Sequence, residues 1–328
     1  MYRSMEQKLI IGKDNAKEAL AGFCEGKDKI VLVTDGVAYG LCGAEKFFDE
    51  FFAAHPAVAI THLIVPNANP KVETVQALLN EINGAIDAFI AVGGGTTIDT
   101  AKLLNLAVVS GMPVKELLTK KTAPDKLLPC MAFPTTAGTG AEATRFAVCY
   151  AGEAKYSIDF EVIRPSDVAL VPEFTATLPA YQKLSTNFDA YAQAVESLWA
   201  KGATEESKKY ANRALVLMKA DNWPEASYWA GRAIDISRTT AAHAFSYYLT
   251  SHYGIPHGHA VYMVFEYICR NNNHPEYIKQ VPGLSSLREL ALEKGVEWET
   301  MVNDLFDHVN LKRLGNNPVE VRKESFHG

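Results

Sequence analysis

The chain's 328 residues, 48% of them apolar, suffice for a large buried core and suggest two domains rather than one. A formal net charge of −6 argues against a nucleic-acid or polybasic membrane partner, and no apolar run approaches the roughly 20 residues that a membrane helix needs. The start of the chain has no secretory signal pattern, and the five scattered cysteines fit a reducing cytosol, so we expect a cytoplasmic protein.

The first half of the sequence alternates short apolar runs with helical patterns. The runs over residues 29–36, 60–66 and 127–136 predict buried strands, and shorter strands are expected within 145–172. The clearest strand, over 87–95, stops at three glycines and is followed by apolar residues at helical spacing. Since strands that alternate with helices form right-handed βαβ units, we expect a parallel sheet.

The pattern changes at about residue 172. The segments that follow are rich in alanine, leucine and aromatic residues, and each has the pattern of a helix with no strand between them. We therefore expect an α/β domain over residues 1–178 and an all-helical domain over residues 179–328.

The sequence GGGTT at 93–97 lies where a predicted strand ends and a helix begins. Glycines at such a place let the backbone approach a phosphate closely, and the free N–H groups of the helix start attract the anion. The pattern differs from the G-x-G-x-x-G dinucleotide fingerprint, so a tight turn that binds nothing is the alternative.

Two further features of the first half fit a nucleotide cofactor. Asp35 ends a predicted strand, where a carboxylate hydrogen-bonds ribose hydroxyls and repels a 2′-phosphate, which favours NAD(H) over NADP(H). The alternative is an Asp that initiates the turn before Gly36. The loop FPTTAGTGAEAT, residues 133–144, offers hydroxyls and bare backbone to a cofactor, or is an ordinary surface loop.

The helical half contains candidate metal ligands. Asp189 and Gln193 are four residues apart on one predicted helix and share a face, His243 lies on another helix, and His257 lies in a turn. Asp and His are suitable ligands for a divalent cation such as Fe²⁺ or Zn²⁺, although two histidines this far apart are more often structural. Asp189 is the more informative residue, because a buried carboxylate must be paired, hydrogen-bonded or metal-bound.

Together these segments resemble the iron-containing (group III) alcohol dehydrogenase family. The matching stretches run in family order from about residue 30 to 260: VTDGVAYG, GGGTTIDTAK, FPTTAGTGAEAT, NFDAYAQAVES, and His243 followed by PHG at 256–258. The resemblance implies a Rossmann-like α/β domain and an all-α metal-binding domain, an architecture shared with dehydroquinate synthase, with the active cleft between them. It also implies an NAD(P)H-dependent oxidoreductase that acts on a small aldehyde or alcohol, and we expect a homo-oligomer, a dimer.

The resemblance assigns roles to individual residues. Asp35 would contact the adenosine ribose and Lys155 the nicotinamide ribose, whereas Asp99 would belong to the helix start rather than to the chemistry. The remaining cofactor contacts, to the pyrophosphate and the adenine side, would come from Gly94, Gly95, Thr96, Thr135 and Thr136.

The family's metal is held by one Asp and three His. Asp189, His243 and His257 match that pattern, but Gln193 stands at the fourth position. Either Gln193 gives a weaker, neutral amide oxygen to the metal, or it contacts the ligands without binding the metal, which then has three protein ligands. Many relatives also carry a His where this chain has Tyr247, and the chain looks shorter than typical members at its C-terminal end.

Within the family, the segments AQAVESLWA and SRTTAAHAFSYYLTSHYGIPHGHAV look most like phosphonoacetaldehyde reductases, which implies reduction of phosphonoacetaldehyde to 2-hydroxyethylphosphonate. A phosphonate dianion needs cationic or N–H donors, and Arg145 and Arg238 are candidates, unless they form ion pairs or pack helices. Besides the metal ligand His257, the residues expected to relay the final proton are Tyr247, His252 and His259.

Two other functions fit the same sequence. One is an NAD-using lyase or cyclase that resembles dehydroquinate synthase, and it would show no net NADH consumption with an aldehyde. The other is a non-catalytic family member that has lost its metal because of Gln193.

Overall fold

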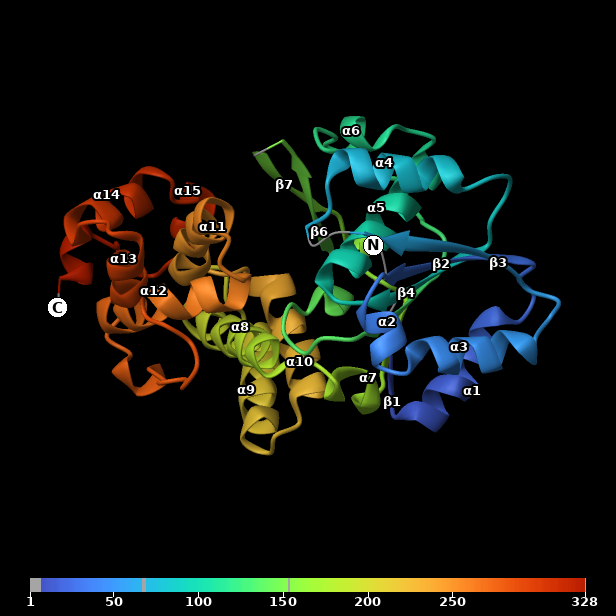
Figure 1. The fold of residues 1–328 in the computed structure, drawn as a ribbon, viewed down its shortest axis with the longest axis horizontal. Coiled ribbons are helices and arrows are strands. Elements are labelled where there is room, and N and C mark those ends of the chain that lie inside the picture. The colour runs from blue at the N-terminus through green and yellow to red at the C-terminus, as the bar shows by residue number, and fades with distance from the viewer. Residues whose placement is uncertain (1–6, 67–68, 153, 328) are drawn as a thin grey trace. The chain divides into compact units, whose positions relative to one another are not determined.

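The computed structural model describes residues 7–66, 69–152 and 154–327, which form two compact units (Figure 1). The first unit comprises Met1–Thr136 with Ala141–Leu178, and the second comprises Ala137–Gly140 with Pro179–Gly328. The first unit has the α/β composition and the second the helical composition that the sequence predicts. The tetrapeptide Ala137–Gly140 belongs to the second unit, although the chain on either side of it belongs to the first.

A parallel sheet forms the centre of the first unit, and its order among the described residues is β1-β8-β5-β4-β2-β3. From β2 the chain continues outward to β3, whereas from β4 it continues to β5 on the other side. This reversal between β2 and β4 is the switch point at which open α/β sheets bind ligands. The strands are β1 (Lys8–Ile11), β2 (Lys29–Asp35), β3 (Ala59–Val65), β4 (Ala88–Gly93), β5 (Cys130–Pro134) and β8 (Asp167–Leu170).

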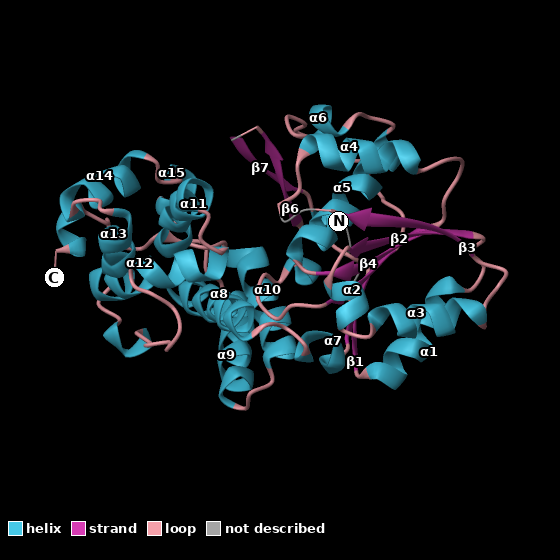
Figure 2. Cartoon of the chain, viewed as in Figure 1, coloured by secondary structure: helices cyan, strands magenta, loops and turns pink. Residues whose placement is uncertain are grey.

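Helices cover both faces of this sheet, as the cyan and magenta elements of Figure 2 show. Because successive side chains of a strand point to opposite faces, Val31 and Val33 of β2 pack in one apolar core, and Ile30 and Leu32 pack in the other. Each of these fully buried aliphatic side chains contributes about 1.5–3 kcal/mol to stability. The helices of this unit are α1 (Lys13–Cys24), α2 (Ala38–Leu41), α3 (Ala44–Ala53), α4 (Val72–Glu81), α5 (Gly95–Ser110), α6 (Val114–Leu117) and α7 (Pro172–Ala176).

Two of the short strands expected within 145–172 lie outside the parallel sheet. Strands β6 (Phe146–Ala151) and β7 (Ala154–Asp159) pair with each other in antiparallel register and form a separate two-stranded sheet. Their connection is much shorter than the dozen or more residues that a parallel crossover needs, so only a hairpin is possible. These two strands therefore form an antiparallel hairpin in addition to the parallel sheet that the sequence predicts.

The second unit is helical, and its central element is α8. Residues 188–197 of α8 are buried on every side of the helix, which is the pattern of a helix surrounded by other helices. No helix of the described residues is both long enough and apolar enough to cross a membrane. The helices are α8 (Ala180–Trp199), α9 (Glu205–Lys219), α10 (Trp223–Ser237), α11 (Ala241–Tyr253), α12 (His257–Asn271), α13 (Leu287–Lys294), α14 (Trp298–Asp307) and α15 (Leu311–Leu314).

Candidate active site

Helix α8 carries three polar side chains through the interior of the second unit. Asp189, Gln193 and Glu196 are only 2%, 3% and 0% exposed. Their spacing of four and three residues places them on one stripe of the helix. Burying an ionised carboxylate costs several kcal/mol unless it is paired or hydrogen-bonded, so the partners of these residues define the site.

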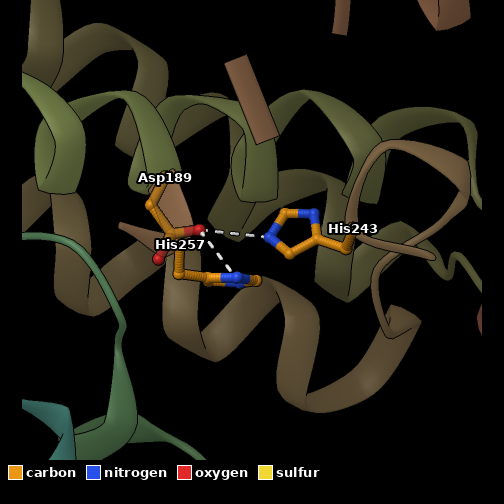
Figure 3. Close-up of side chains that lie close together, drawn as sticks. All are labelled: Asp189, His243 and His257. Carbon is orange, nitrogen blue, oxygen red and sulfur yellow. Dashed lines mark hydrogen bonds and ion pairs between the residues drawn. The ribbon is translucent and has the colours of Figure 1, made fainter. Parts of the chain in front are cut away.

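Two histidines from other helices meet Asp189 (Figure 3). Nε2 of His243, on α11, lies 3.1 Å from Oδ1 of Asp189, and Nε2 of His257, on α12, lies 4.0 Å from the same oxygen. The three possible ligand atoms all lie within 4.8 Å of one another. In a tetrahedral site with metal–ligand bonds of about 2.1 Å, ligand atoms are roughly 3.4 Å apart, so this group needs only small movements to converge on one cation.

Glu196 holds His243 from the side opposite Asp189. Its Oε2 lies 2.5 Å from Nδ1 of His243, and its carboxylate also accepts the hydroxyl of Thr240 at 2.7 Å and the N–H of Ala242 at 2.9 Å. Thr240 and Ala242 are at the start of α11, where backbone N–H groups have no partner within the helix. Glu196 therefore caps α11 and orients His243 at the same time. The sequence reasoning missed it, although its place on the stripe of Asp189 was a usable signal.

These contacts shift the ionisation of the cluster. Burial alone would lower the pKa of His243, but the charge of Glu196 and the hydrogen bonds to both carboxylates raise it to about 10. Burial would raise the pKa of Asp189, but the nearby His257 charge and hydrogen bonds from His243 and Gln193 lower it. Asp189 is therefore held as a carboxylate, the form that a metal requires.

A glycine brings His257 to Asp189. His257 is the first residue of α12, so the expectation that it lies in a turn is wrong; the helix begins directly after Pro256, because proline disrupts a helix only when it lies beyond the first turn. A Cβ on Gly258 would overlap the carbonyl oxygen of Ser185 and lie 3.0 Å from Cβ of Asp189. Helix α12 can press against α8 at this point only because residue 258 has no side chain.

The tetrapeptide Ala137–Gly140 reaches the same helix. Nε2 of Gln193 donates to the carbonyl of Thr139 at 3.3 Å, whereas Oε1 of Gln193 is buried and has no hydrogen-bond partner among the described residues. A Cβ on Gly138 would lie 2.6 Å from the carbonyl oxygen of Thr186, so the tetrapeptide lies directly on α8. Part of the loop that the sequence assigned to a cofactor thus supports the candidate metal ligands.

The three residues expected to relay the proton, Tyr247, His252 and His259, each contact different partners. Tyr247 stacks on His257, with ring centroids 5.8 Å apart and planes at 16°. His252 stacks on Tyr248 at 5.0 Å. His259 is buried, with Nε2 donating to the carbonyl of Ser285 at 2.8 Å and Nδ1 2.7 Å from the hydroxyl of Tyr181.

Because the Ser285 carbonyl can only accept, Nδ1 of His259 accepts from Tyr181, and burial lowers the pKa of His259. Of the three expected relays, the described contacts link only Tyr247 to the group formed by Asp189, His243 and His257.

Both candidate arginines are engaged in local contacts. Arg145 lies in the first unit, 3.3 Å from Asp159 and 3.0 Å from Glu161. Arg238 follows α10 in the second unit, and its guanidinium donates to the carbonyl of Asp235. Its φ of +63° is rare for a residue with a side chain. These are the contacts expected if the arginines form ion pairs or pack against helices.

Except for Lys155, the residues expected to bind the cofactor lie at the ends of three neighbouring strands of the first unit, β2, β4 and β5. Oδ1 of Asp35, at the end of β2, accepts the N–H groups of Val37 and Ala38, which begin the next helix. Its Oδ2 is buried and has no hydrogen-bond partner among the described residues. Asp35 thus acts as a turn residue through one oxygen, while the other oxygen is not used by the turn.

The segments that follow β4 and β5, on one side of the switch point, contain glycine backbone and threonine hydroxyls. A Cβ on Gly94 would lie 3.2 Å from Cγ2 of Thr136, so a side chain at this position would crowd Thr136. The N–H of Thr135 donates to the carbonyl of Gly93, and the Thr135 hydroxyl is buried without a hydrogen-bond partner among the described residues. Gly95 is the first residue of α5, and Oγ1 of Thr96 accepts the N–H of Asn69 at 3.2 Å.

The GGGTTIDTAK motif has two charged residues, Asp99 and Lys102, and both form hydrogen bonds to the backbone of other segments of the first unit. Asp99 accepts the N–H of Val148 at 2.9 Å and so supports β6. Lys102, which the sequence reasoning missed, is 1% exposed and donates to the carbonyls of Ala141 at 2.6 Å and Thr144 at 2.8 Å. Lys155 lies on β7 with its ammonium 5.9 Å from the ring centroid of Tyr150.

Comparison with known proteins agrees with this arrangement. The sequence profile of the iron-containing alcohol dehydrogenases matches residues 6–172. The chain belongs to the iron-containing alcohol dehydrogenase family. This confirms the family that the sequence motifs predicted.

Individual members of the family are similar to the chain over most of its length. Phosphonoacetaldehyde reductase from Streptomyces viridochromogenes is 31% identical over 64% of this chain, and the match spans 60% of that relative. NAD-dependent methanol dehydrogenase from Bacillus methanolicus is 27% identical over 81% of this chain and 72% of its own.

The crystal structure of sulfoacetaldehyde reductase from Bifidobacterium kashiwanohense in complex with NAD⁺ has a TM-score of 0.81 at 25% identity, and covers 99% of this chain and 96% of its own.

Proposed function

We propose that the protein reduces a small aldehyde to a primary alcohol with a nicotinamide cofactor and a divalent metal, and that phosphonoacetaldehyde is its preferred substrate. The observation that carries this proposal is the convergence of Asp189, His243 and His257 from three helices, in a chain of the iron-containing alcohol dehydrogenase family.

The residues of the second unit fit a divalent metal. Asp189 provides a buried carboxylate, and His243 and His257 provide Nε2 atoms that point toward it (Figure 3). One carboxylate and two imidazoles are a common ligand set for Zn²⁺ and Fe²⁺. A metal held there would supply Lewis acidity toward the carbonyl oxygen of the substrate. Glu196 fixes the ring of His243, and Gly258 keeps α12 close enough to α8 for His257 to join it.

The residues of the first unit fit a dinucleotide. Gly94 leaves backbone open beside Thr136 at the start of α5, where N–H groups favour a phosphate. The partnerless Oδ2 of Asp35 suits a ribose hydroxyl and would repel a 2′-phosphate, which supports NAD(H) over NADP(H). The nicotinamide supplies the hydride, and the protein supplies binding and orientation. A relative named as NAD-dependent and a similar structure with NAD⁺ bound support the same preference.

Two similar proteins support the choice of substrate. Their names, phosphonoacetaldehyde reductase and sulfoacetaldehyde reductase, both denote action on a two-carbon aldehyde that carries an anionic group. We therefore propose an aldehyde of this kind, with the phosphonate preferred because that relative has the higher sequence identity.

The test is an assay of NADH and NADPH consumption by purified protein that is loaded with Fe²⁺, Zn²⁺ or Mn²⁺. The panel contains phosphonoacetaldehyde, sulfoacetaldehyde and acetaldehyde, and the product is identified by phosphorus or proton NMR. We expect NADH consumption that is fastest with phosphonoacetaldehyde and lost reversibly on chelation. Bound metal without NADH consumption on any aldehyde would contradict a reductase, and equal rates on all three would contradict the preference for phosphonate.

A further inference from the structure

The side-chain amine of Lys279, in the segment between α12 and α13, carries an inference that reaches beyond the proposed reaction. We propose that Lys279 is a covalent modification site, where the amine forms an imine with a small aldehyde that bears an anionic group, and that Lys219 attracts this group. The inference rests on the proposed function only in its choice of phosphonoacetaldehyde as the aldehyde.

The first argument is the lack of an oxygen acceptor. Nζ of Lys279 lies 3.9 Å from the ring centroid of Tyr191, on α8, and makes no hydrogen bond or ion pair among the described residues. The face of an aromatic ring attracts a cation by about 0.5–1 kcal/mol at an exposed site, but it has no oxygen lone pair for the three N–H groups. Loss of a proton from this amine therefore breaks no hydrogen bond to a carbonyl or carboxylate.

The second argument is access. Lys279 is exposed, and it lines a hollow together with Ile278, Gln280, Phe188 and Tyr262. A two-carbon aldehyde can therefore reach the amine from solvent and place its carbon chain against apolar and aromatic side chains.

The third argument is that two acidic side chains near Lys279 have other partners. Glu266, on α12, lines the same hollow, but its Oε1 lies 2.6 Å from a guanidinium nitrogen of Arg270. Glu276, on the same segment as Lys279, lies 2.9 Å from Nδ1 of His274. Neither carboxylate forms an ion pair that would hold Lys279 in its charged form.

The fourth argument is the like charge of Lys219, the last residue of α9. Partial burial lowers the pKa of Lys279, and the charge of Lys219 lowers it further. Because the neutral amine is the form that attacks a carbonyl carbon, a lower pKa makes Lys279 more reactive near neutral pH. The Lys219 charge that disfavours the Lys279 ammonium also attracts an anionic group.

The proposed step balances without an oxidant or a reductant. The lone pair of the neutral amine attacks the carbonyl carbon, the C=O π bond breaks, and the oxygen takes up a proton. The nitrogen lone pair then forms the C=N bond as that oxygen leaves as water. In total the amine loses two hydrogens, which depart with the carbonyl oxygen.

The test uses the purified protein with no nicotinamide, so that reductase turnover cannot consume the aldehyde. Phosphonoacetaldehyde or acetaldehyde is added with sodium cyanoborohydride, which converts each imine to a stable secondary amine. Peptide mass spectrometry then locates the adducts at substoichiometric loading. We expect Lys279 to carry the largest share of them. Adducts spread evenly over the lysines, or concentrated on another amine, would overturn the proposal.

Matched variants separate the roles of the two lysines. Lys279→Arg keeps the charge but should remove the main adduct, whereas its control, Lys209→Arg at an exposed position on α9, should keep it. Lys219→Gln should lower the preference of Lys279 for phosphonoacetaldehyde over acetaldehyde by roughly 2- to 5-fold, the size expected for an interaction between exposed charges. Lys209→Gln should leave this preference unchanged. An equal preference in wild type and Lys219→Gln would overturn the role of Lys219.

The modification and the proposed function can fail separately. Imine formation needs neither the metal nor the nicotinamide, and Lys279 is no part of the group formed by Asp189, His243 and His257. An adduct at Lys279 in a protein that consumes no NADH would overturn only the proposed function. NADH consumption with no adduct at Lys279 would overturn only the modification site.

Discussion

Nδ1 of His243 lies 2.5 Å from Oε2 of Glu196, and the same carboxylate accepts the first free N–H groups of the helix that carries His243. One side chain of α8 thus sets both the position of α11 and the orientation of the imidazole on it. The ring nitrogen that faces Asp189 is directed by the bond on the other side of the ring.

We predict that Glu196→Gln lowers metal affinity by roughly 10- to 100-fold, because the neutral amide holds the His243 ring less firmly. Competition with a chelator measures this effect. The control is Glu205→Gln, an exposed position at the start of α9, which should leave affinity unchanged. An affinity of Glu196→Gln within twofold of wild type would show that the ring of His243 is oriented by other contacts.

His257→Ala should abolish aldehyde reduction and leave NADH binding intact, because His257 belongs to the second unit and the expected cofactor residues belong to the first. Steady-state rates and NADH fluorescence titration measure the two effects. His327→Ala, which loses an imidazole near the exposed Glu299, is the control. Full activity in His257→Ala would exclude a role for this residue as a metal ligand.

For Asp35 we predict a change in cofactor choice. Asp35→Ser keeps an oxygen that can accept the N–H groups of Val37 and Ala38, but removes the charge that would repel a 2′-phosphate. The NADPH to NADH ratio of kcat/KM should rise by roughly 10-fold, which corresponds to about 1.4 kcal/mol. An unchanged ratio would mean that Asp35 serves only the turn.

Gly258→Ala should weaken both metal binding and the fold. Its methyl group would overlap the Ser185 carbonyl oxygen, and the displacement of α12 should cost about 1–3 kcal/mol, measured by denaturant unfolding. The matched control is Gly22→Ala in α1, where an added Cβ meets no atom within 4 Å and should stabilise the protein slightly. A stability equal to wild type would show that α12 can shift without cost.

Glu142 predicts a pH dependence of stability in the first unit. It is 2% exposed, and burial raises its pKa to about 7. A raised pKa means that the folded protein retains a proton that the unfolded chain loses near pH 4.5. The contribution of Glu142 to the free energy of unfolding therefore falls as the pH rises from about 4.5 to 7.

The total effect is on the order of 3 kcal/mol. Glu142→Gln should be less dependent on pH than wild type over this range, and more stable than wild type at pH 8. Parallel pH profiles of the two melting temperatures would contradict the prediction.

The features that could be predicted from sequence are those with local causes. The apolar runs that became β2 and β4 could be predicted because a strand buried on both faces reads as a continuous apolar segment. The run that became β3 was also expected to be a buried strand, but β3 is the edge strand of the sheet and several of its residues are exposed. The spacing of Asp189 and Gln193 likewise predicts a shared face, because four residues make about one helical turn.

The features that were missed depend on partners that are remote in sequence. Glu196 and His243 are 47 residues apart, and Lys102 and Thr144 are 42 apart, so neither residue has a local pattern that reveals its partner. The start of α12 at His257 was misplaced because Gly254 and Pro256 indicate a turn, and the helix begins immediately after it. Strands β6 and β7 pair in antiparallel register because the connection between them is short. The apolar pattern of the sequence shows that strands are present there but does not show how they pair.

The placement of Ala137–Gly140 has a practical outcome for anyone who dissects this protein. Because the chain leaves the first unit for these four residues and then returns to it, neither half is encoded by one uninterrupted stretch. A recombinant fragment that begins at Pro179 would lack the Thr139 carbonyl and the glycines that lie against Thr186 and Gly231. Such a fragment would need those residues supplied in trans as a short peptide, or grafted through a linker, to rebuild the surroundings of Gln193.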